Sequence, residues 1–215
     1  MKDGNLSNGL FDPGLEHSAC GVGFVTRKDS SQTHELLLLG HQALCAVPHR
    51  GGMSSEGVGD GAGISIDLSV SFFSRISARK LSSGGFGVGN FFLPSDEGQH
   101  DRAIQLVEEH LNAAGLNTIK TRELPVDKNQ IRPRAVKWQL PIRQWIFLPN
   151  KQTDEQTFER QIHRALLSIE AIAYSDSKLD GLYPLSMSAR LQVLKGRLNS
   201  WELIPYFKDL EAKDH

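Results

Sequence analysis

Apolar residues recur at intervals of three and four in three segments, and each segment predicts an amphipathic helix. The first helix covers about 33–47, and Pro48 ends it because the residue before a proline avoids the α region. The second covers 101–114. The third opens at a capping box of Thr153 and Gln156. Its apolar positions are Phe158, Ile162, Ala165, Leu166, Ile169 and Ala173.

Alternation of apolar with small or polar residues predicts strands at 20–26, 64–68, 87–93 and 187–194. The segment before residue 20 is rich in glycine and asparagine and reads as irregular. Few helices separate the predicted strands, so we expect a mixed or antiparallel sheet rather than a regular series of parallel βαβ units.

The length of 215 residues fits one domain of mixed helix and strand, or two small ones. Lys and Arg number 24 against 25 Asp and Glu, so no whole-molecule field attracts nucleic acid or an anionic membrane surface. No apolar run approaches the length that spans a bilayer, and the first twenty residues do not form a secretory signal. Two cysteines cannot make a disulfide scaffold, which favours a reduced, cytoplasmic protein.

Two glycine-dense loops, 57–63 and 85–89, suggest nucleotide binding, but their context argues against it. A dinucleotide-binding loop needs a helix after the glycines, so that phosphate meets the helix N-terminus. Both loops are instead followed by predicted strands, and no Gly-Lys-Ser/Thr occurs. Tight turns and close strand packing explain these glycines better.

The histidines do not predict a metal site. His17, His34, His41 and His49 are irregularly spaced, without Cys-x-x-Cys or a His pair one helical turn apart. We expect His41 to be an ordinary helix residue at the edge of the core.

The two cysteines differ in their surroundings. Cys45 lies in the apolar part of the first predicted helix, where a buried, inert thiol is expected. Cys20 has small neighbours, Ala19, Gly21 and Gly23, which leave its backbone accessible. Local sequence alone leaves both a catalytic and a structural role open for Cys20.

A set of short motifs, in this order and at these spacings, resembles the N-terminal region of the glutamate synthase large subunit. The motifs are Gly9-Leu-Phe-Asp-Pro13, Glu16-His17, Cys20-Gly-Val-Gly-Phe-Val25, His49-Arg-Gly51 and Gly59-Asp-Gly-Ala-Gly63. The resemblance continues through Phe86–Pro94, Leu124-Pro-Val126, Phe158-Glu-Arg160 and Met187 to Gly196. That region of the family is a class II glutamine amidotransferase, one of the N-terminal nucleophile hydrolases.

The resemblance implies an α+β fold in which two antiparallel sheets stack between helix layers, an αββα sandwich, here incomplete. It implies a propeptide-like leader over 1–19 and the N-terminal part of the amidotransferase domain over 20–215. Cys20 would be the nucleophile, exposed as the first residue of the mature chain. Arg50 and Gly51 would belong to the active-site or substrate-binding loop, with structural stabilisation of that loop as the equal alternative for Arg50. The substrate would be L-glutamine.

The sequence also departs from the family pattern. The family continues into a Ser-Arg-Phe-Ser-Thr-Asn element, an oxyanion-stabilising Asn-Gly pair and a substrate-binding Asp, none of which this sequence reaches. No cofactor is expected in this chain, because FMN and an iron–sulfur cluster would belong to synthase domains that it lacks. We therefore expect glutamine hydrolysis for glutamate biosynthesis, with a complementing chain as a possible partner. The alternatives are a non-catalytic remnant or interaction subunit, and an amidotransferase with another acceptor.

Overall fold

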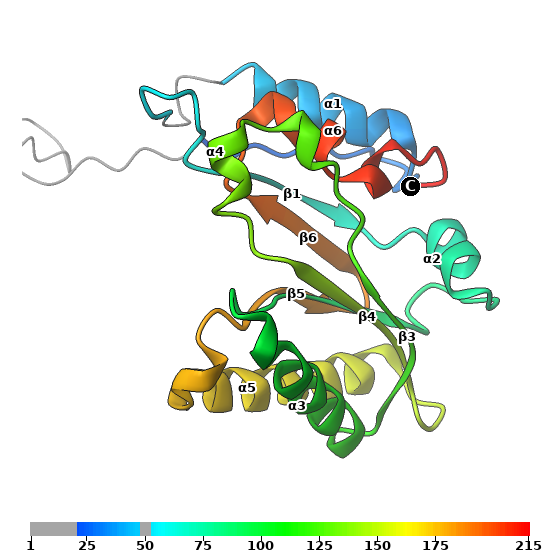
Figure 1. The fold of residues 1–215 in the computed structure, drawn as a ribbon. Helices are drawn as coiled ribbons and strands as arrows, with labels where there is room; N and C mark the ends of the chain where they lie inside the picture. Colours follow the sequence, from blue (N-terminus) through cyan, green and yellow to red (C-terminus); the bar gives the residue numbers. More distant parts are fainter. Residues whose placement is uncertain (1–20, 48–52) are drawn as a thin grey trace, which may run out of the picture.

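The computed structural model describes residues 21–47 and 53–215, which form two antiparallel sheets enclosed by helices (Figure 1). The strands are β1 (Ala62–Asp67), β2 (Gly87–Phe92), β3 (Leu116–Glu123), β4 (Ile142–Pro149), β5 (Tyr183–Ser188) and β6 (Leu191–Gly196). The helices are α1 (His34–Cys45), α2 (Val70–Ser77), α3 (His100–Ala113), α4 (Pro133–Val136), α5 (Glu155–Ser175) and α6 (Leu203–Tyr206).

The layers follow the order helix, sheet, sheet, helix. One sheet has the strand order β3-β4-β2-β5, and the other pairs β1 with β6. Helices α3 and α5 cover the four-stranded sheet, and α1 and α6 cover the β1–β6 pair (Figure 1). This arrangement confirms the expected α+β sandwich of antiparallel sheets.

Each helix layer has its own apolar core. Between α3, α5 and the four-stranded sheet, the rings of Phe91, Trp145, Phe147 and Phe158 are fully buried. Leu37 of α1 and Leu203 of α6 pack with Leu194 of β6 on the opposite side of the molecule. Apolar burial is the main favourable term in folding, so these two cores fix the helices that flank the sheets.

A buried amide network joins the two sheets. Asn90 of β2, Gln144 of β4 and Gln192 of β6 are each at most 1% exposed. The Gln144 amide donates to Asn90 Oδ1 at 2.8 Å and to Gln192 Oε1 at 3.2 Å. Asn90 donates in turn to the Val193 carbonyl at 3.3 Å. Unpaired buried amides are costly, so this network favours one relative placement of the sheets.

The predicted helices are present close to their expected bounds. Thr33 caps α1, and its hydroxyl accepts a hydrogen bond from the Leu36 amide at 3.3 Å. The segment predicted at 101–114 is α3. The third helix is α5, but the predicted capping box of Thr153 and Gln156 is wrong. The cap is Asp154, whose carboxylate accepts from the Thr157 amide at 2.8 Å, so the helix starts one residue later.

Two of the predicted strands are confirmed and two are corrected. The strands expected at 64–68 and 87–93 are β1 and β2. The strand expected at 187–194 is divided between β5 and β6, because the chain bends at 189–190 and passes from one sheet to the other. The strand expected at 20–26 is absent over 21–26, because no backbone hydrogen bond joins this segment to a described strand. Alternation marks a segment that can pair, but the partner is a tertiary feature.

Candidate functional site

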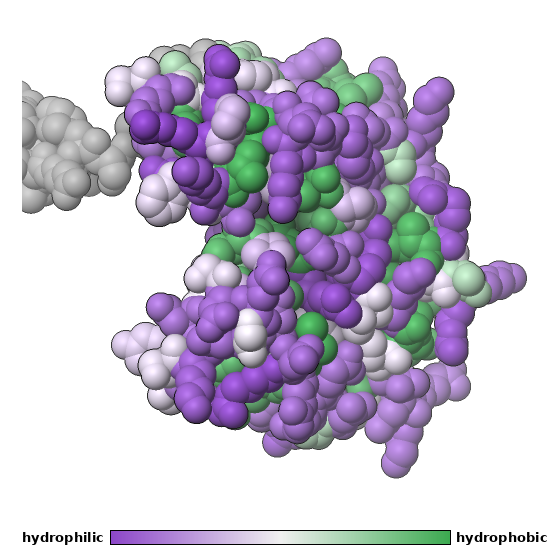
Figure 2. Space-filling model, viewed as in Figure 1, coloured by the Kyte–Doolittle hydropathy of each residue, from purple (hydrophilic) through white to green (hydrophobic). Residues whose placement is uncertain are grey.

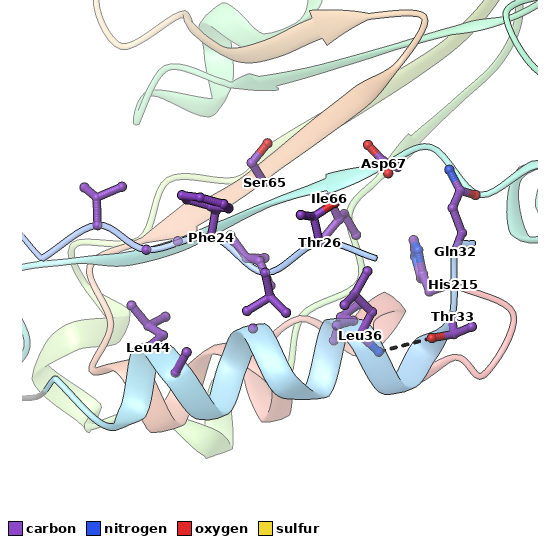
Figure 3. A pocket seen from close by; sticks show the side chains of 18 of the residues that line it. Phe24, Thr26, Gln32, Thr33, Leu36, Leu44, Ser65, Ile66, Asp67 and His215 are labelled. Carbon is purple, nitrogen blue, oxygen red and sulfur yellow. Dashed lines mark hydrogen bonds between the residues drawn. The ribbon is translucent and has the colours of Figure 1, made fainter. Parts of the chain in front are cut away.

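A groove of about 1100 Å³ lies between the extended segment 21–26, helix α1 and strand β1 (Figure 3). We call it the α1–β1 groove. Its helical wall is one face of α1 together with the residues just before and after this helix. The wall residues recur every three or four positions: Thr33, Leu37, Gly40, Leu44 and Val47. Its strand wall is Gly63–Asp67 of β1. The three walls therefore come from two separate regions of the sequence.

One end of the groove is polar. Gln32, Thr33, Asp67 and His215 gather there, and Leu44 lies toward the opposite end (Figure 3). Asp67 is the only acidic side chain among the described lining residues. The middle and far end are formed mainly by apolar and glycine positions, so charge is confined to one end.

His215 is the most unusual group of the polar end. The residue is 9% exposed, and its ring stacks on Phe72 with ring centroids 4.0 Å apart. Neither ring nitrogen has a hydrogen-bond partner within the described chain. Burial lowers the pKa of His215 to about 4, against the opposing attraction of Asp214, so the ring is neutral near pH 7. It therefore brings unmet hydrogen-bonding capacity to the groove.

The predicted nucleophile Cys20 and the predicted loop residues Arg50 and Gly51 lie outside the described residues. Their nearest described neighbours in sequence are informative. Gly21, which follows Cys20, and Val47, the last described residue before Arg50, both line the α1–β1 groove. The described residues that adjoin the two predicted site regions in sequence therefore border one groove.

Cys45 is half-buried rather than fully buried as the sequence suggested. Its sulfur lies 3.6 Å from His41 Nε2, and the same nitrogen is 3.0 Å from the Ser200 carbonyl oxygen. A carbonyl can only accept, so the ring proton resides on Nε2 and points at Ser200. That atom cannot also take a proton from the thiol, and Cys45 has no base at this contact. His41 is a helix residue that ties α1 to the C-terminal segment.

The glycine loops serve packing, as the sequence context indicated. A Cβ atom on Gly59 would lie 2.4 Å from the Leu198 carbonyl oxygen, and one on Gly63 would lie 2.7 Å from Lys195 Cβ. Gly63 allows β1 to approach β6 closely, and Gly59 allows the loop before β1 to approach the segment that follows β6. Within the described part of the chain, no group of three or more potential metal ligands is present.

The chain belongs to the class-II glutamine amidotransferases, whose family profile matches residues 20–215. Its relatives are glutamate synthases. It is 32% identical over 216 residues to the glutamate synthase [NADH] of Saccharomyces cerevisiae. This alignment covers 94% of the chain and 10% of the yeast protein. It is 30% identical over 205 residues to the glutamate synthase [NADPH] large chain of Azospirillum brasilense, in an alignment that covers 93% of this chain and 14% of the relative. The Bacillus subtilis large chain is 28% identical over 210 residues, covering 95% and 14%.

The chain thus spans about a tenth to a seventh of the length of these relatives. The domain that it shares with them is the N-terminal glutamine amidotransferase domain of glutamate synthase. Across the described residues, none of the helices is both long and apolar enough to cross a bilayer.

Proposed function

We propose that this chain hydrolyses glutamine with Cys20 as the nucleophile, and that the ammonia released serves glutamate biosynthesis. The observation that carries the proposal is the family match over 20–215, which begins at Cys20 itself. The α1–β1 groove supports it, because Gly21 and Val47, the described neighbours of the two predicted site regions in sequence, both line it.

The proposed chemistry requires that residues 1–19 are removed as a propeptide. A free α-amino group has a pKa of about 7.7–8.0 and can take the proton of its own residue's thiol near neutral pH. The thiolate of Cys20 attacks the side-chain amide carbon of glutamine, the C–N bond breaks, and ammonia leaves. Water then cleaves the glutamyl thioester and releases glutamate. Arg50 and Gly51 are proposed to hold the active-site loop beside this nucleophile.

We further propose that this domain is an N-terminal nucleophile hydrolase that works in the cytoplasm together with synthase domains, which a complementing polypeptide could supply. The relatives support a role beside synthase domains, since they are glutamate synthases seven to ten times longer than the matched segment. The non-catalytic remnant is the competing proposal. It would retain the sandwich and the α1–β1 groove without processing at Cys20.

The test combines intact mass with an assay of glutamate release. Catalysis by Cys20 would be supported by two results together. The chain would be processed before Cys20, and glutamate formation would be lost in Cys20→Ser but kept in Cys45→Ser. Cys45→Ser is the matched control because it removes the other thiol, which lacks a base. Unprocessed chain without turnover, both alone and with the complementing synthase polypeptide co-expressed, would favour the remnant.

A further inference from the structure

The residues around helix α4 concentrate positive charge. Between positions 128 and 143 the chain carries no acidic residue, and its basic residues there are Lys128, Arg132, Arg134, Lys137 and Arg143. Arg134 is paired with Glu56 of a neighbouring loop. Arg132 and Lys137 are exposed, and no described carboxylate forms a salt bridge with either of them. Local charge of one sign attracts partners of the opposite sign.

A second basic segment, Lys195-Gly-Arg197, lies at the end of β6, and α4 stands next to that end in Figure 1. Gln139 joins the two segments, because its side-chain amide donates to the Arg197 carbonyl at 2.8 Å. A Cβ atom on Gly196 would lie 2.9 Å from Gln139 Oε1, so this contact is close. We call the surface formed by Lys137, Trp138, Lys195 and Arg197 the α4–β6 basic face.

Two cations of this face are held by aromatic rings. The central carbon of the Arg197 guanidinium lies 5.4 Å from the centre of the Trp138 ring, and Lys195 Nζ lies 4.8 Å from that of Tyr183. Neither cation forms a salt bridge with a described carboxylate. A ring attracts a cation through its face and leaves the N–H edge of a guanidinium unused. Arg197 is therefore positioned with donors available to a carboxylate, which an arginine binds at two points.

Other exposed arginines of this surface are satisfied within the chain. Arg75, Arg102 and Arg190 each donate to a carboxylate. Figure 2 shows a largely hydrophilic surface over the layer that contains α4, so apolar burial alone does not define a docking surface there. The α4–β6 basic face combines charge with a large ring, since Trp138 is 64% exposed. Tryptophan and arginine are among the residues that dominate binding energy at protein interfaces.

We propose that the α4–β6 basic face binds an acidic segment of a partner polypeptide. Its carboxylates pair with Arg197 and Lys195, and an apolar side chain packs on Trp138. Charge complementarity selects this partner. Nucleic acid fits less well, because the whole chain has a net charge of -1 and the face neutralises only a short run of phosphates. The proposal goes beyond glutamine hydrolysis and does not depend on processing at Cys20.

The test measures binding of the fluorescein-labelled peptide Asp-Glu-Leu-Asp-Glu-Phe-Asp-Glu to the full chain by fluorescence anisotropy. The comparison peptide, Asn-Gln-Leu-Asn-Gln-Phe-Asn-Gln, keeps the apolar residues and removes the charge. Arg197→Glu reverses a charge on the face, and Lys137→Glu is a second reversal in case the first variant does not fold. Arg164→Glu is the matched control, because Arg164 is exposed on α5, in the opposite helix layer.

The acidic peptide is expected to bind at least about tenfold more tightly than the amide peptide. Arg197→Glu should weaken its binding by about tenfold, whereas Arg164→Glu should change it by less than about twofold because salt screens distant charges. Trp138→Ala should weaken binding by about fivefold, and Trp138→Phe should restore most of the loss, since a ring again supports Arg197.

Equal affinity for the two peptides would overturn the proposal. Equal weakening by Arg197→Glu and Arg164→Glu would also overturn it, because binding would then follow net charge and not this face. Tighter binding of an oligothymidylate of the same length, lost in the same variants, would identify single-stranded nucleic acid as the occupant instead. None of these readouts uses glutamate release, so failure of this proposal is distinct from failure of the proposed activity.

Discussion

Arg122 of β3 and Asp209 form a two-point salt bridge between side chains that are 87 positions apart in the sequence. Arg122 Nη1 donates to Asp209 Oδ1 at 3.1 Å, and Arg122 Nε donates to Gln144 Oε1 at 2.9 Å. The two charged side chains are 17% and 10% exposed. This pair ties the four-stranded sheet and its amide network to the C-terminal segment, which also carries one end of the α1–β1 groove.

Asp209→Ala is expected to lower the free energy of unfolding by about 3 kcal/mol, because it leaves the largely buried Arg122 guanidinium without its carboxylate. Urea unfolding measures the loss. Glu56→Ala is the matched control, since it breaks the exposed pair with Arg134 and should cost at most about 0.5 kcal/mol. Equal losses of unfolding free energy in the two variants would contradict a stabilising role for the Asp209–Arg122 pair.

Gly59→Ala should cost about 2 kcal/mol, since the new methyl group would overlap the Leu198 backbone. That backbone cannot move aside easily, because Asn199 is fixed by Glu202, whose carboxylate accepts from the Asn199 amide at 2.8 Å. Gly23→Ala is the control: a Cβ there meets open space, and a change within about 0.5 kcal/mol is expected. Thermal and urea unfolding of both variants check this. Tolerance of alanine at position 59 would contradict the packing explanation of this glycine loop.

Helices α1, α3 and α5 and strands β1 and β2 could be predicted from sequence because their signals are local. Periodicity over 101–114 suffices to define α3, and the apolar stripe of 33–47 with Pro48 after it suffices to define α1. Strands β3 and β4 went unpredicted. β4 is buried on both faces, so its residues do not alternate in polarity, and β3 has a mixed burial pattern. The division of 187–194 between two sheets has no local signal either, because the bend lacks the usual turn residues.

The sequence could suggest the residues and the reaction of the candidate site, but not the groove beside them. Resemblance of the short motifs suggested Cys20, Arg50 and Gly51, which all lie outside the described residues. The groove depends on helix α1 meeting β1 across a space, and the burial of His215 depends on its stacking with Phe72. Such contacts between distant parts of the chain leave no pattern in a single sequence.

Thr33→Ala should destabilise the chain by about 1 kcal/mol, because the first turn of α1 loses the acceptor for the Leu36 amide. Thr33→Ser keeps a hydroxyl at the same place and should restore most of the loss. Urea unfolding, together with amide exchange at the start of α1, measures both. If serine and alanine destabilise equally, the hydroxyl is not the cap.

Stability is expected to fall as the pH drops from about 6.5 to about 4. Burial lowers the pKa of folded His215 to about 4, whereas the unfolded residue titrates at its ordinary 6.5. Within this window the unfolded state binds the extra proton, so the free energy of unfolding decreases by up to about 3 kcal/mol as the pH falls. The salt bridge to Arg75 keeps the pKa of Asp214 below its usual value, so its own loss comes mainly at lower pH.

His215→Phe keeps an aromatic ring against Phe72 and removes the titrating group. The difference in unfolding free energy between the original chain and this variant, measured by urea titration from pH 8 to pH 4, isolates the contribution of His215. A difference that does not change across this range would contradict a buried, neutral imidazole.

The most direct test of the central claim is peptide mapping after reaction with a glutamine analogue that carries an electrophilic diazoketone. If Cys20 is the processed N-terminal nucleophile, the adduct will appear on a peptide that begins at Cys20, excess glutamine will protect it, and Cys45 will remain largely unmodified. Equal labelling of the two thiols, preference for Cys45, or an adduct that glutamine does not suppress would contradict glutamine hydrolysis by Cys20.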